Sequence, residues 1–342
     1  HHQAGSAAKA EIDAATIKIA SLLGVQPAEI IYTSGASEAN NFALKGLARL
    51  SRHAGRHIIS TPLEHSSVSG TLTALQEQGY EIDLLDVKQD GTVDLEHLKD
   101  LLRPDTICVA VTLVDSELGV VQPVQEIAAI LKAYPHCHLH VDATQAVGKI
   151  PVSFEGVDTM SLTAHKFYGL NGIGLLIKRR NLALEPLIHG GESTTIYRSG
   201  TPTVALASSL ACALDLAVTD LPGRVDHVAK LNAELRAALS TYPLVRINSP
   251  EGAVPQILNL SVQNVKGTVF QRELDAKGVC VSVKSACSSD GLPSRAVFAV
   301  SRDRRNALSS WRISLSHLTT EDEIKAFLQA FDVCYRELTA VH

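Results

Sequence analysis

The chemistry that this sequence most clearly offers rests on one lysine and one aspartate. Lys166 stands in the run 161–174, where a His-Lys pair is surrounded by small residues, and Asp142 lies in the short apolar segment 141–145. Pyridoxal 5'-phosphate (PLP) needs a lysine amine for its Schiff base. It also needs a carboxylate that keeps its pyridine nitrogen protonated, so that the ring can accept electrons from a carbanion. The two segments therefore predict a PLP site, with Lys166 and Asp142 in those roles.

Two further segments offer groups for the same cofactor. In residues 33–38, small residues follow a predicted strand and precede a helix, so backbone N–H groups and hydroxyls could hold an anion at the helix N-terminus. An ordinary strand-to-helix turn with an N-cap has the same composition, and the segment taken alone favours that interpretation. His65, within 61–67, could stack on the cofactor ring, although a single loop histidine is more often a solvated or capping residue.

A cysteine in the last quarter of the chain is a candidate nucleophile. Cys287 lies in 284–293, a polar segment rich in small residues that is typical of a mobile loop. A thiol with an ordinary pKa of about 8.5 is only partly ionised at neutral pH, and the cation of Lys284 favours the thiolate. By contrast, Cys108, Cys212 and Cys280 have apolar neighbours, and we expect them to be unreactive structural thiols.

Composition narrows the class of protein. The 342 residues are 45% hydrophobic, and no apolar run approaches the roughly 20 residues that span a bilayer, so no membrane role is expected. A net charge of −5 argues against a nucleic-acid-binding surface. Six widely spaced cysteines predict neither a metal site nor a disulfide framework, and they fit a reducing, cytoplasmic location.

Short β-rich runs alternate with helical patterns in the first half of the chain, starting with a helix over 6–23 that Gly24 ends. This alternation predicts βαβ units and a mostly parallel sheet with helices on both faces. Ligands of such sheets bind at the carboxyl ends of the strands, where the candidate cofactor residues would fall. The predicted strands are 30–33, 57–60, 81–85, 107–112, 138–141 and 174–177.

A helical pattern over 204–221 ends at Pro222-Gly223, which predicts the domain boundary. Residues 1–221 would form a large PLP-binding domain, and residues 222–342 a small domain that carries the loop of Cys287. The elements predicted beyond the boundary are a helix over 225–239, strands over 257–261 and 279–283, and a helix from 321.

Seven ordered segments resemble the cysteine desulfurases of the NifS and IscS type, which are class V aminotransferases. The resemblance covers essentially the whole chain. It implies an α/β, fold type I PLP-dependent transferase, with a mostly parallel seven-stranded sheet in the large domain and an α+β C-terminal domain. It also implies a homodimer with active sites at the subunit interface. The segments are 32–38, 64–65, 141–148, 165–169, 198–201, 285–289 and 312–315.

The resemblance implies roles for residues around the cofactor ring. Lys166 matches the Schiff-base lysine, Asp142 the partner of the pyridine nitrogen, and Gln145 the donor to the phenolic oxygen. His65 matches the histidine that stacks on the ring, and it would also assist proton transfer.

For the cofactor phosphate, the resemblance implies Ser37, Thr163 and His165 as ligands, with Thr201 reaching the phosphate from the other subunit.

On the substrate side, the resemblance implies that Arg312 binds the α-carboxylate of L-cysteine, which its planar fork can hold with two hydrogen bonds. Cys287 would take the substrate sulfur as a persulfide, with release of L-alanine. The sulfur would then pass to an acceptor protein, an iron–sulfur scaffold or a tRNA thiolation factor.

The chain departs from the family pattern at several points. Asp115-Ser116 stands where the family has two asparagines, so Ser116 would have to replace the second one in the site, and Glu192 falls in a run that has lost an arginine. The sequence opens on His1-His2 and its only methionine is Met160. We therefore expect a native N-terminal segment to be missing, and the two histidines could be a tag remnant.

Two alternatives stay open from the sequence. One is another class V PLP enzyme, such as a selenocysteine lyase or an aminotransferase, and the other is a degenerate scaffold that binds partners without chemistry.

Overall fold

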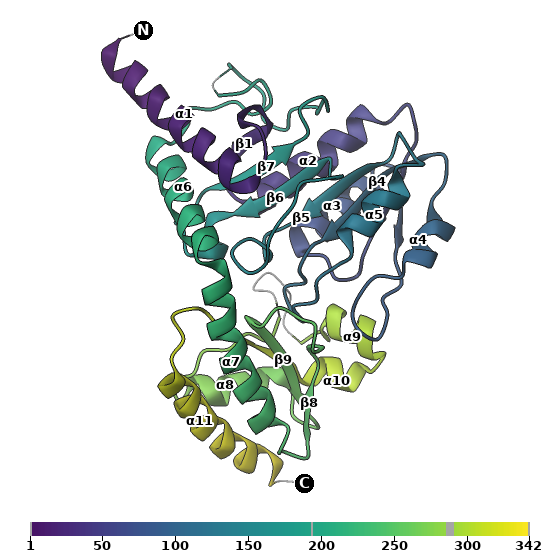
Figure 1. The fold of residues 1–342 in the computed structure, drawn as a ribbon. Coiled ribbons are helices and arrows are strands. Elements are labelled where there is room, and N and C mark those ends of the chain that lie inside the picture. The colour runs from purple at the N-terminus through teal and green to yellow at the C-terminus, as the bar shows by residue number, and fades with distance from the viewer. Residues whose placement is uncertain (1, 193, 285–290, 341–342) are drawn as a thin grey trace. The chain divides into compact units, whose positions relative to one another are not determined.

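The computed structural model describes residues 2–192, 194–284 and 291–340. The chain divides into two compact units, which are coloured along the sequence in Figure 1. The first unit comprises His1–Leu85, Asp94–Val114 and Gln122–Leu221; the second comprises Asp86–Val93, Asp115–Val121 and Pro222–His342. The boundary predicted from the sequence assigned the two short segments of the second unit to the large domain.

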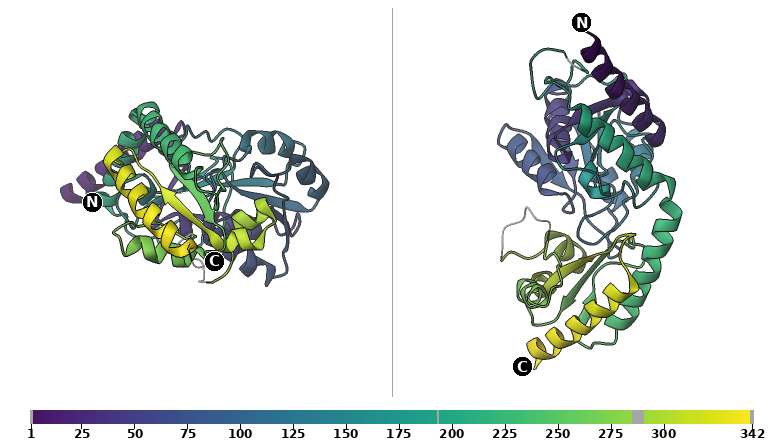
Figure 2. Two further views of the ribbon diagram at one scale, coloured as in Figure 1. Left: turned by 90° about the horizontal axis from the view of Figure 1, so that it is seen from below. Right: turned by 90° about the vertical axis from the view of Figure 1, so that its left-hand side faces the viewer.

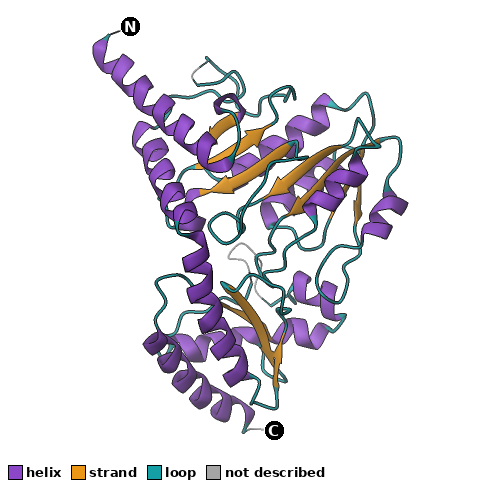
Figure 3. Ribbon diagram, viewed as in Figure 1, coloured by secondary structure: helices purple, strands orange, loops and turns teal. Residues whose placement is uncertain are grey.

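A seven-stranded sheet forms the centre of the first unit, with strand order β1-β7-β6-β5-β4-β2-β3. Neighbours from β6 to β3 pair in parallel, whereas β7 is antiparallel to both β1 and β6. This confirms the predicted mostly parallel α/β sheet (Figure 3). The strands are β1 (Ile30–Thr33), β2 (His57–Ser60), β3 (Glu81–Leu84), β4 (Thr106–Thr112), β5 (His138–Asp142), β6 (Thr159–Thr163) and β7 (Gly174–Lys178).

Six of these strands lie within one residue of the ranges predicted from the sequence, and β6 has no counterpart among those ranges. Only Met160 and Leu162 are strongly apolar in β6, so the segment lacks a continuous hydrophobic run. All five of its residues are nevertheless buried, because the strand pairs on both sides.

Helices pack on the sheet and on one another. The helices are α1 (Gln3–Leu23), α2 (Ala36–Leu50), α3 (Ser66–Gln76), α4 (Leu95–Leu101), α5 (Val124–Leu131) and α6 (Val204–Thr219), with 3-10 turns η1 (Pro27–Glu29) and η2 (Ala164–Phe167). α1 runs alongside α6 (Figures 1 and 2) and ends, as predicted, at Gly24 in the left-handed conformation that glycine favours.

Helix α2 packs on β4, β5, β6 and β7 in the middle of the sheet. Its apolar face buries Phe42, Leu44 and Leu47 against Ile58 and other core residues. Truncating a buried phenylalanine such as Phe42 to alanine costs roughly 3–5 kcal/mol. This packing fixes the helix that carries the candidate anion-binding turn.

The second unit holds a three-stranded antiparallel sheet of order β10-β9-β8. Its core stacks Phe270 on Trp311, with ring centroids 5.1 Å apart, and places Phe331 5.2 Å from Phe270. The elements are α7 (Leu221–Leu239), β8 (Val245–Ile247), β9 (Ile257–Val262), α8 (Gly267–Asp275), α9 (Arg295–Ser301), α10 (Arg304–Ser309), β10 (Ser310–Ser314) and α11 (Glu321–Thr339).

One local prediction for this unit was wrong: residues 279–283 form no strand and contribute only an isolated bridge between Ser282 and Arg312. Helix α6 ends at Thr219, just before the predicted boundary at Pro222-Gly223, and these two residues lie in the first turn of α7. A proline is tolerated there because the first N–H groups of a helix have no intrahelical acceptor.

Candidate active site

The predicted cofactor residues of the first unit gather where its parallel strands end. Asp142 is the last residue of β5, Thr163 is the last residue of β6, and Lys166 follows in η2. Ser37 lies in the first turn of α2, directly after β1, and His65 caps α3 after β2. The residues therefore share the carboxyl edge of the sheet, as predicted from the alternation of strands and helices.

The carboxylate of Asp142 is buried, and two donors hold it. Its Oδ2 accepts from Asn40 Nδ2 at 3.0 Å, and its Oδ1 accepts from the backbone N–H of Thr144 at 2.9 Å. Each oxygen keeps a second lone pair, so the carboxylate can still accept a hydrogen bond from a ligand. This is the geometry that a protonated pyridine nitrogen requires of its partner.

The ring of His65 is neutral and oriented by Ser67. His65 Nδ1 accepts from the backbone N–H of Ser67 at 3.1 Å and lies 2.9 Å from the Ser67 hydroxyl. Partial burial lowers the pKa of His65; Asp142 opposes this shift and Lys166 adds to it. Because Nδ1 is an acceptor, the neutral ring carries its proton on Nε2.

Lys166 is exposed on η2, and Tyr168 ends this turn in the left-handed conformation, with φ of 70°. The neighbouring His165 is also exposed, and its Nδ1 lies 3.2 Å from the Thr163 hydroxyl. Partial burial lowers the pKa of His165, and the Lys166 cation lowers it further. An exposed amine beside an exposed imidazole can reach a ligand at this edge.

The turn before α2 has the features of an anion cradle. Gly35 stands at the N-cap and brings no capping side chain, so the N–H groups of the first turn can serve a bound anion. Gly174 lets β7 approach this turn, since a Cβ there would lie 2.7 Å from the Cα of Gly35. The side chain of Ser37 is exposed at the same helix end.

Glu38 ties a later loop to this turn. It accepts from the backbone N–H of Ser34 at 2.7 Å and from Arg198 Nε at 2.9 Å. Burial opposes ionisation of Glu38, but the hydrogen bonds from Arg198 and Ser34 outweigh it and lower the pKa of the carboxyl group. The pair fixes the start of the segment that carries Thr201, whose own side chain is exposed.

These residues fit PLP. An anion cradle, a buried carboxylate and an exposed lysine lie along one sheet edge, and the half-buried Gln145 stands three residues after Asp142. The buried hydroxyl of Thr144 has no hydrogen-bond partner among the described residues, so it can serve a bound group. The donor set therefore suits a phosphorylated pyridine aldehyde.

Arg312 and Ser116, the predicted substrate residues, meet within the second unit. Arg312 lies on β10, and its Nη1 donates to the backbone carbonyl of Ser116. Burial lowers the pKa of Arg312, although Glu117 and Asp115 oppose this shift. Arg312 Nε has no partner among the described residues, so the guanidinium keeps a free donor for an anion.

Two carboxyl groups, the buried Asp115 and the partly buried Glu117, lie near this arginine. Burial, together with the nearby Glu117, raises the pKa of Asp115 to about 7. Burial also raises the pKa of Glu117, although a hydrogen bond from the Ser294 hydroxyl opposes the shift. An asparagine at position 115 would have no such charge to bury.

The exposure of the cysteines differs from what the sequence predicts. Cys287 lies outside the described residues, so its predicted role stays a prediction. Cys108 is buried as expected, but Cys212 and Cys280 are exposed. Cys212 lies on the outer side of α6, and Cys280 lies in irregular chain with its Sγ 3.9 Å from Asp275 Oδ1.

Sequence reasoning missed four polar residues behind the site. They are Asn40, Ser67, His140 and Ser161, and hydrogen bonds join all of them to one another or to Asp142. One signal could have found His140, because this histidine stands between Leu139 and Val141 in a predicted strand, and the last four residues of that strand are all buried.

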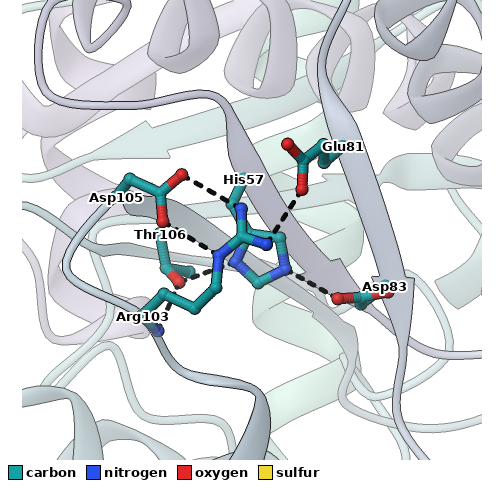
Figure 4. Close-up of polar contacts among 6 residues, drawn as sticks. All are labelled: His57, Glu81, Asp83, Arg103, Asp105 and Thr106. Atoms are coloured by element: carbon teal, nitrogen blue, oxygen red, sulfur yellow. Dashed lines mark hydrogen bonds and ion pairs between the residues drawn. The ribbon is translucent and has the colours of Figure 1, made fainter.

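A second polar cluster lies at the amino ends of β2, β3 and β4 (Figure 4). The fully buried His57 bonds Thr106 Oγ1 at 2.7 Å through Nδ1 and Asp83 Oδ2 at 3.0 Å through Nε2. Arg103 bridges Glu81 and Asp105 at the same edge. These contacts tie strand ends together, on the edge away from the candidate cofactor residues.

Within the described residues, no group of three or more His, Cys, Asp or Glu side chains could hold a metal ion. In the same part of the chain, no single helix is long and apolar enough to cross a membrane; α6 and α7 pass only together, as a bent pair, by length and composition.

Known proteins resemble this chain over most of its length. The family model described as aminotransferase class-V matches residues 1–327. Cysteine desulfurase IscS of Dictyoglomus turgidum is 35% identical over 345 residues, which is 99% of this chain and 87% of the relative. Cysteine desulfurase IscS of Proteus mirabilis is 39% identical over 329 residues, which is 94% of this chain and 81% of the relative. A solved structure described as a NifS-like protein superposes with a TM-score of 0.92 at 34% identity, and the match covers 100% of this chain and 91% of that one. The chain belongs to the class V aminotransferase family.

Proposed function

We propose that this protein is a PLP-dependent cysteine desulfurase, which removes sulfur from L-cysteine and releases L-alanine. The observation that carries the proposal is the sheet edge on which the buried carboxylate of Asp142, the neutral ring of His65 and the exposed amine of Lys166 converge. The names of the two IscS relatives support the same activity.

The residues of the first unit prepare the cofactor. When bound, PLP supplies an electron sink for negative charge at the substrate Cα. Lys166 would hold the cofactor through its amine, and the same amine would move the proton of the substrate Cα. Asp142 holds the proton on the pyridine nitrogen, and Gln145 donates to the phenolic oxygen. His65 stacks on the ring and assists the proton transfers.

The phosphate ligands are Ser37, Thr163 and His165, together with the first-turn N–H groups of α2. Thr201 of the partner subunit completes this set.

Residues of the second unit act on L-cysteine. The guanidinium of Arg312 grips the substrate α-carboxylate, and Ser116 orients that guanidinium through its carbonyl oxygen. The thiolate of Cys287 attacks the substrate sulfur, so an S–S bond forms as the C–S bond breaks. The electron pair of the C–S bond stays with the three-carbon product, whose Cβ takes up a proton, and this product leaves as L-alanine.

The persulfide sulfur on Cys287 then passes to an acceptor thiolate on a partner protein by attack and exchange. The acceptor is an iron–sulfur scaffold or a tRNA thiolation factor. The five described cysteines are free, which supports a cytoplasmic location.

The functional form is a homodimer whose active sites lie at the subunit interface. Large apolar side chains on the first unit support this form. Tyr168 and Leu170, just after Lys166, are 59% and 56% exposed, and Ile196 is 61% exposed. A second subunit would cover exposed apolar side chains of this kind.

The experiment that tests this function compares the wild type with Cys287→Ser and Lys166→Ala. We expect Cys287→Ser to retain the visible absorbance of bound PLP while the formation of alanine and sulfide from L-cysteine falls at least about a thousandfold, because no thiolate takes the sulfur. Lys166→Ala should lose the absorbance band as well.

Unchanged turnover by Cys287→Ser would contradict the proposal, and turnover restricted to selenocysteine, or formation of a keto acid, would identify another class V enzyme. A wild-type protein that shows no visible band with PLP would favour the non-catalytic scaffold.

A further inference from the structure

Asn40 uses its complete hydrogen-bonding capacity behind the cofactor site. It lies on α2 and is fully buried. Its Nδ2 donates to Asp142 Oδ2 at 3.0 Å and to Ser67 Oγ at 2.9 Å. Its Oδ1 lies 2.9 Å from His140 Nε2 and accepts from Ser161 Oγ. A side-chain amide has two N–H groups and two lone pairs, and all four are engaged.

This network allows only one orientation of the amide. A carboxylate accepts hydrogen bonds and donates none, so Nδ2 must face Asp142. The oxygen of Asn40 then needs donors, which are the Ser161 hydroxyl and the Nε2–H of His140. Burial lowers the pKa of His140 and keeps its ring neutral, with Nδ1 facing Thr159 Oγ1 at 2.9 Å. A flipped amide would place its oxygen against the carboxylate of Asp142. It would also place its N–H groups toward the Nε2–H of His140, which is itself a donor.

The second N–H of Asn40 reaches the other side of the cofactor site. Because Ser67 Oγ accepts from Asn40, the Ser67 hydroxyl proton is left to donate to His65 Nδ1 at 2.9 Å. One amide therefore orients the carboxylate proposed to face the pyridine nitrogen and, through Ser67, the imidazole proposed to stack on the ring.

We propose that Asn40 is a positioning residue that holds Asp142 and His65 in register with each other around the cofactor. The proposal rests on the roles proposed above for Asp142, His65 and Lys166. Asn40 touches neither substrate nor cofactor; it acts by donating one N–H to the carboxylate and one to the serine that orients the histidine.

Loss of Asn40 weakens the contact between Asp142 and the pyridine nitrogen. Asn40→Ala removes a charge-assisted donor from Asp142, and such hydrogen bonds are roughly twice as strong as neutral ones, so the Kd for PLP should rise at least about tenfold. When the pyridine nitrogen holds its proton less strongly, the ring withdraws less electron density from the Schiff base. The apparent pKa of the visible band should therefore rise in the variant.

The test titrates the absorbance of the PLP-loaded protein with pH and measures PLP dissociation after dilution. The matched control is Asn232→Ala in the second unit. Asn232 is also a buried asparagine, and it donates to Pro255 O and accepts from Arg236 Nε. This control should lose stability yet keep the titration and the Kd of the wild type, which separates positioning from a general loss of stability.

Ser67→Ala is the second variant and replaces Asn40→Ala if that protein does not fold. It removes the acceptor of one Asn40 N–H and the donor to His65, so the band should move in the same direction by a smaller amount. Wild-type titration and PLP affinity in Asn40→Ala, or in Ser67→Ala where that variant replaces it, would overturn the proposal while leaving the function intact. Absence of the visible band from the wild type would instead refute the proposed function.

Discussion

Asp115 shows how burial and a neighbouring carboxyl group can change the charge of a side chain. Its Oδ2 accepts from the backbone N–H groups of Glu117 and Leu118, and its Oδ1 has no partner among the described residues. Burial, aided by Glu117, raises its pKa to about 7 from the ordinary value of 3.8. The folded protein therefore keeps a proton that the unfolded chain releases above about pH 4.

The pH dependence of stability follows from this difference. Because the folded pKa of Asp115 is raised, its contribution to stability is complete below about pH 4 and is lost as the pH rises through 7. Asp115→Asn should remove that loss and raise the free energy of unfolding at pH 8 by roughly 2–4 kcal/mol, with little change at pH 4.

Urea denaturation at the two pH values, with the surface variant Asp322→Asn as control for the loss of one carboxyl group, checks the prediction. Equal pH slopes for Asp115→Asn and the wild type would contradict it.

At the level of elements, polar residues at the carboxyl ends and at the amino ends of the parallel strands have different roles. The carboxyl ends of β5 and β6 present Asp142 and Thr163 to a ligand, whereas the amino ends of β2 and β4 present His57 and Thr106 to each other. Parallel strands place all their carboxyl ends at one edge, so the polar groups at the other edge are left to join neighbouring strands.

We expect His57→Ala to destabilise the protein without affecting the cofactor. The variant loses two buried hydrogen bonds and leaves a cavity, which should lower the free energy of unfolding by roughly 2–4 kcal/mol. The visible absorbance of bound PLP should stay unchanged, because the length of β2, about 10 Å, lies between the edge with His57 and the edge with the proposed cofactor residues.

Arg103→Ala, which removes exposed ion pairs at the same edge, is the control and should cost less than about 1 kcal/mol. A loss of PLP binding in His57→Ala would show that this edge communicates with the site.

At the level of the whole molecule, the chemistry is divided between two compact units. The proposed cofactor residues all lie in the first unit, and the proposed carboxylate ligand Arg312 lies in the second. A segment that interrupts the first unit in sequence, Asp115–Val121, packs with the second and supplies Ser116 to Arg312. Binding of the cofactor and binding of the substrate should therefore respond to different substitutions.

Arg312→Lys tests this division. A lysine keeps the charge but cannot form two parallel hydrogen bonds with a carboxylate, so the KM for L-cysteine should rise by about 10–100-fold. The visible absorbance and the Kd for PLP should match those of the wild type, which serves as the internal control. A variant that also loses PLP would show that Arg312 supports the cofactor site.

Local sequence predicted several elements well and others badly, for physical reasons. Strands such as Ile30–Thr33 and His57–Ser60 are short apolar or β-branched runs bounded by turns, so composition marks them. The strand expected at 279–283 is equally apolar, but only Ser282 finds a pairing partner there. Hydrogen bonding to a neighbouring strand makes a strand, and the local composition does not specify that neighbour.

The sequence by itself determined the fold class and the residues able to do the chemistry, because Lys166 and Asp142 belong to local motifs at the ends of predicted strands. Only the tertiary structure decided which side chains form hydrogen bonds around Asp142. Asn40 reaches partners that are 27, 100, 102 and 121 residues away in the chain, namely Ser67, His140, Asp142 and Ser161. Hydrogen bonds depend on distance and direction in space, and only the folded chain brings these side chains within reach of one another.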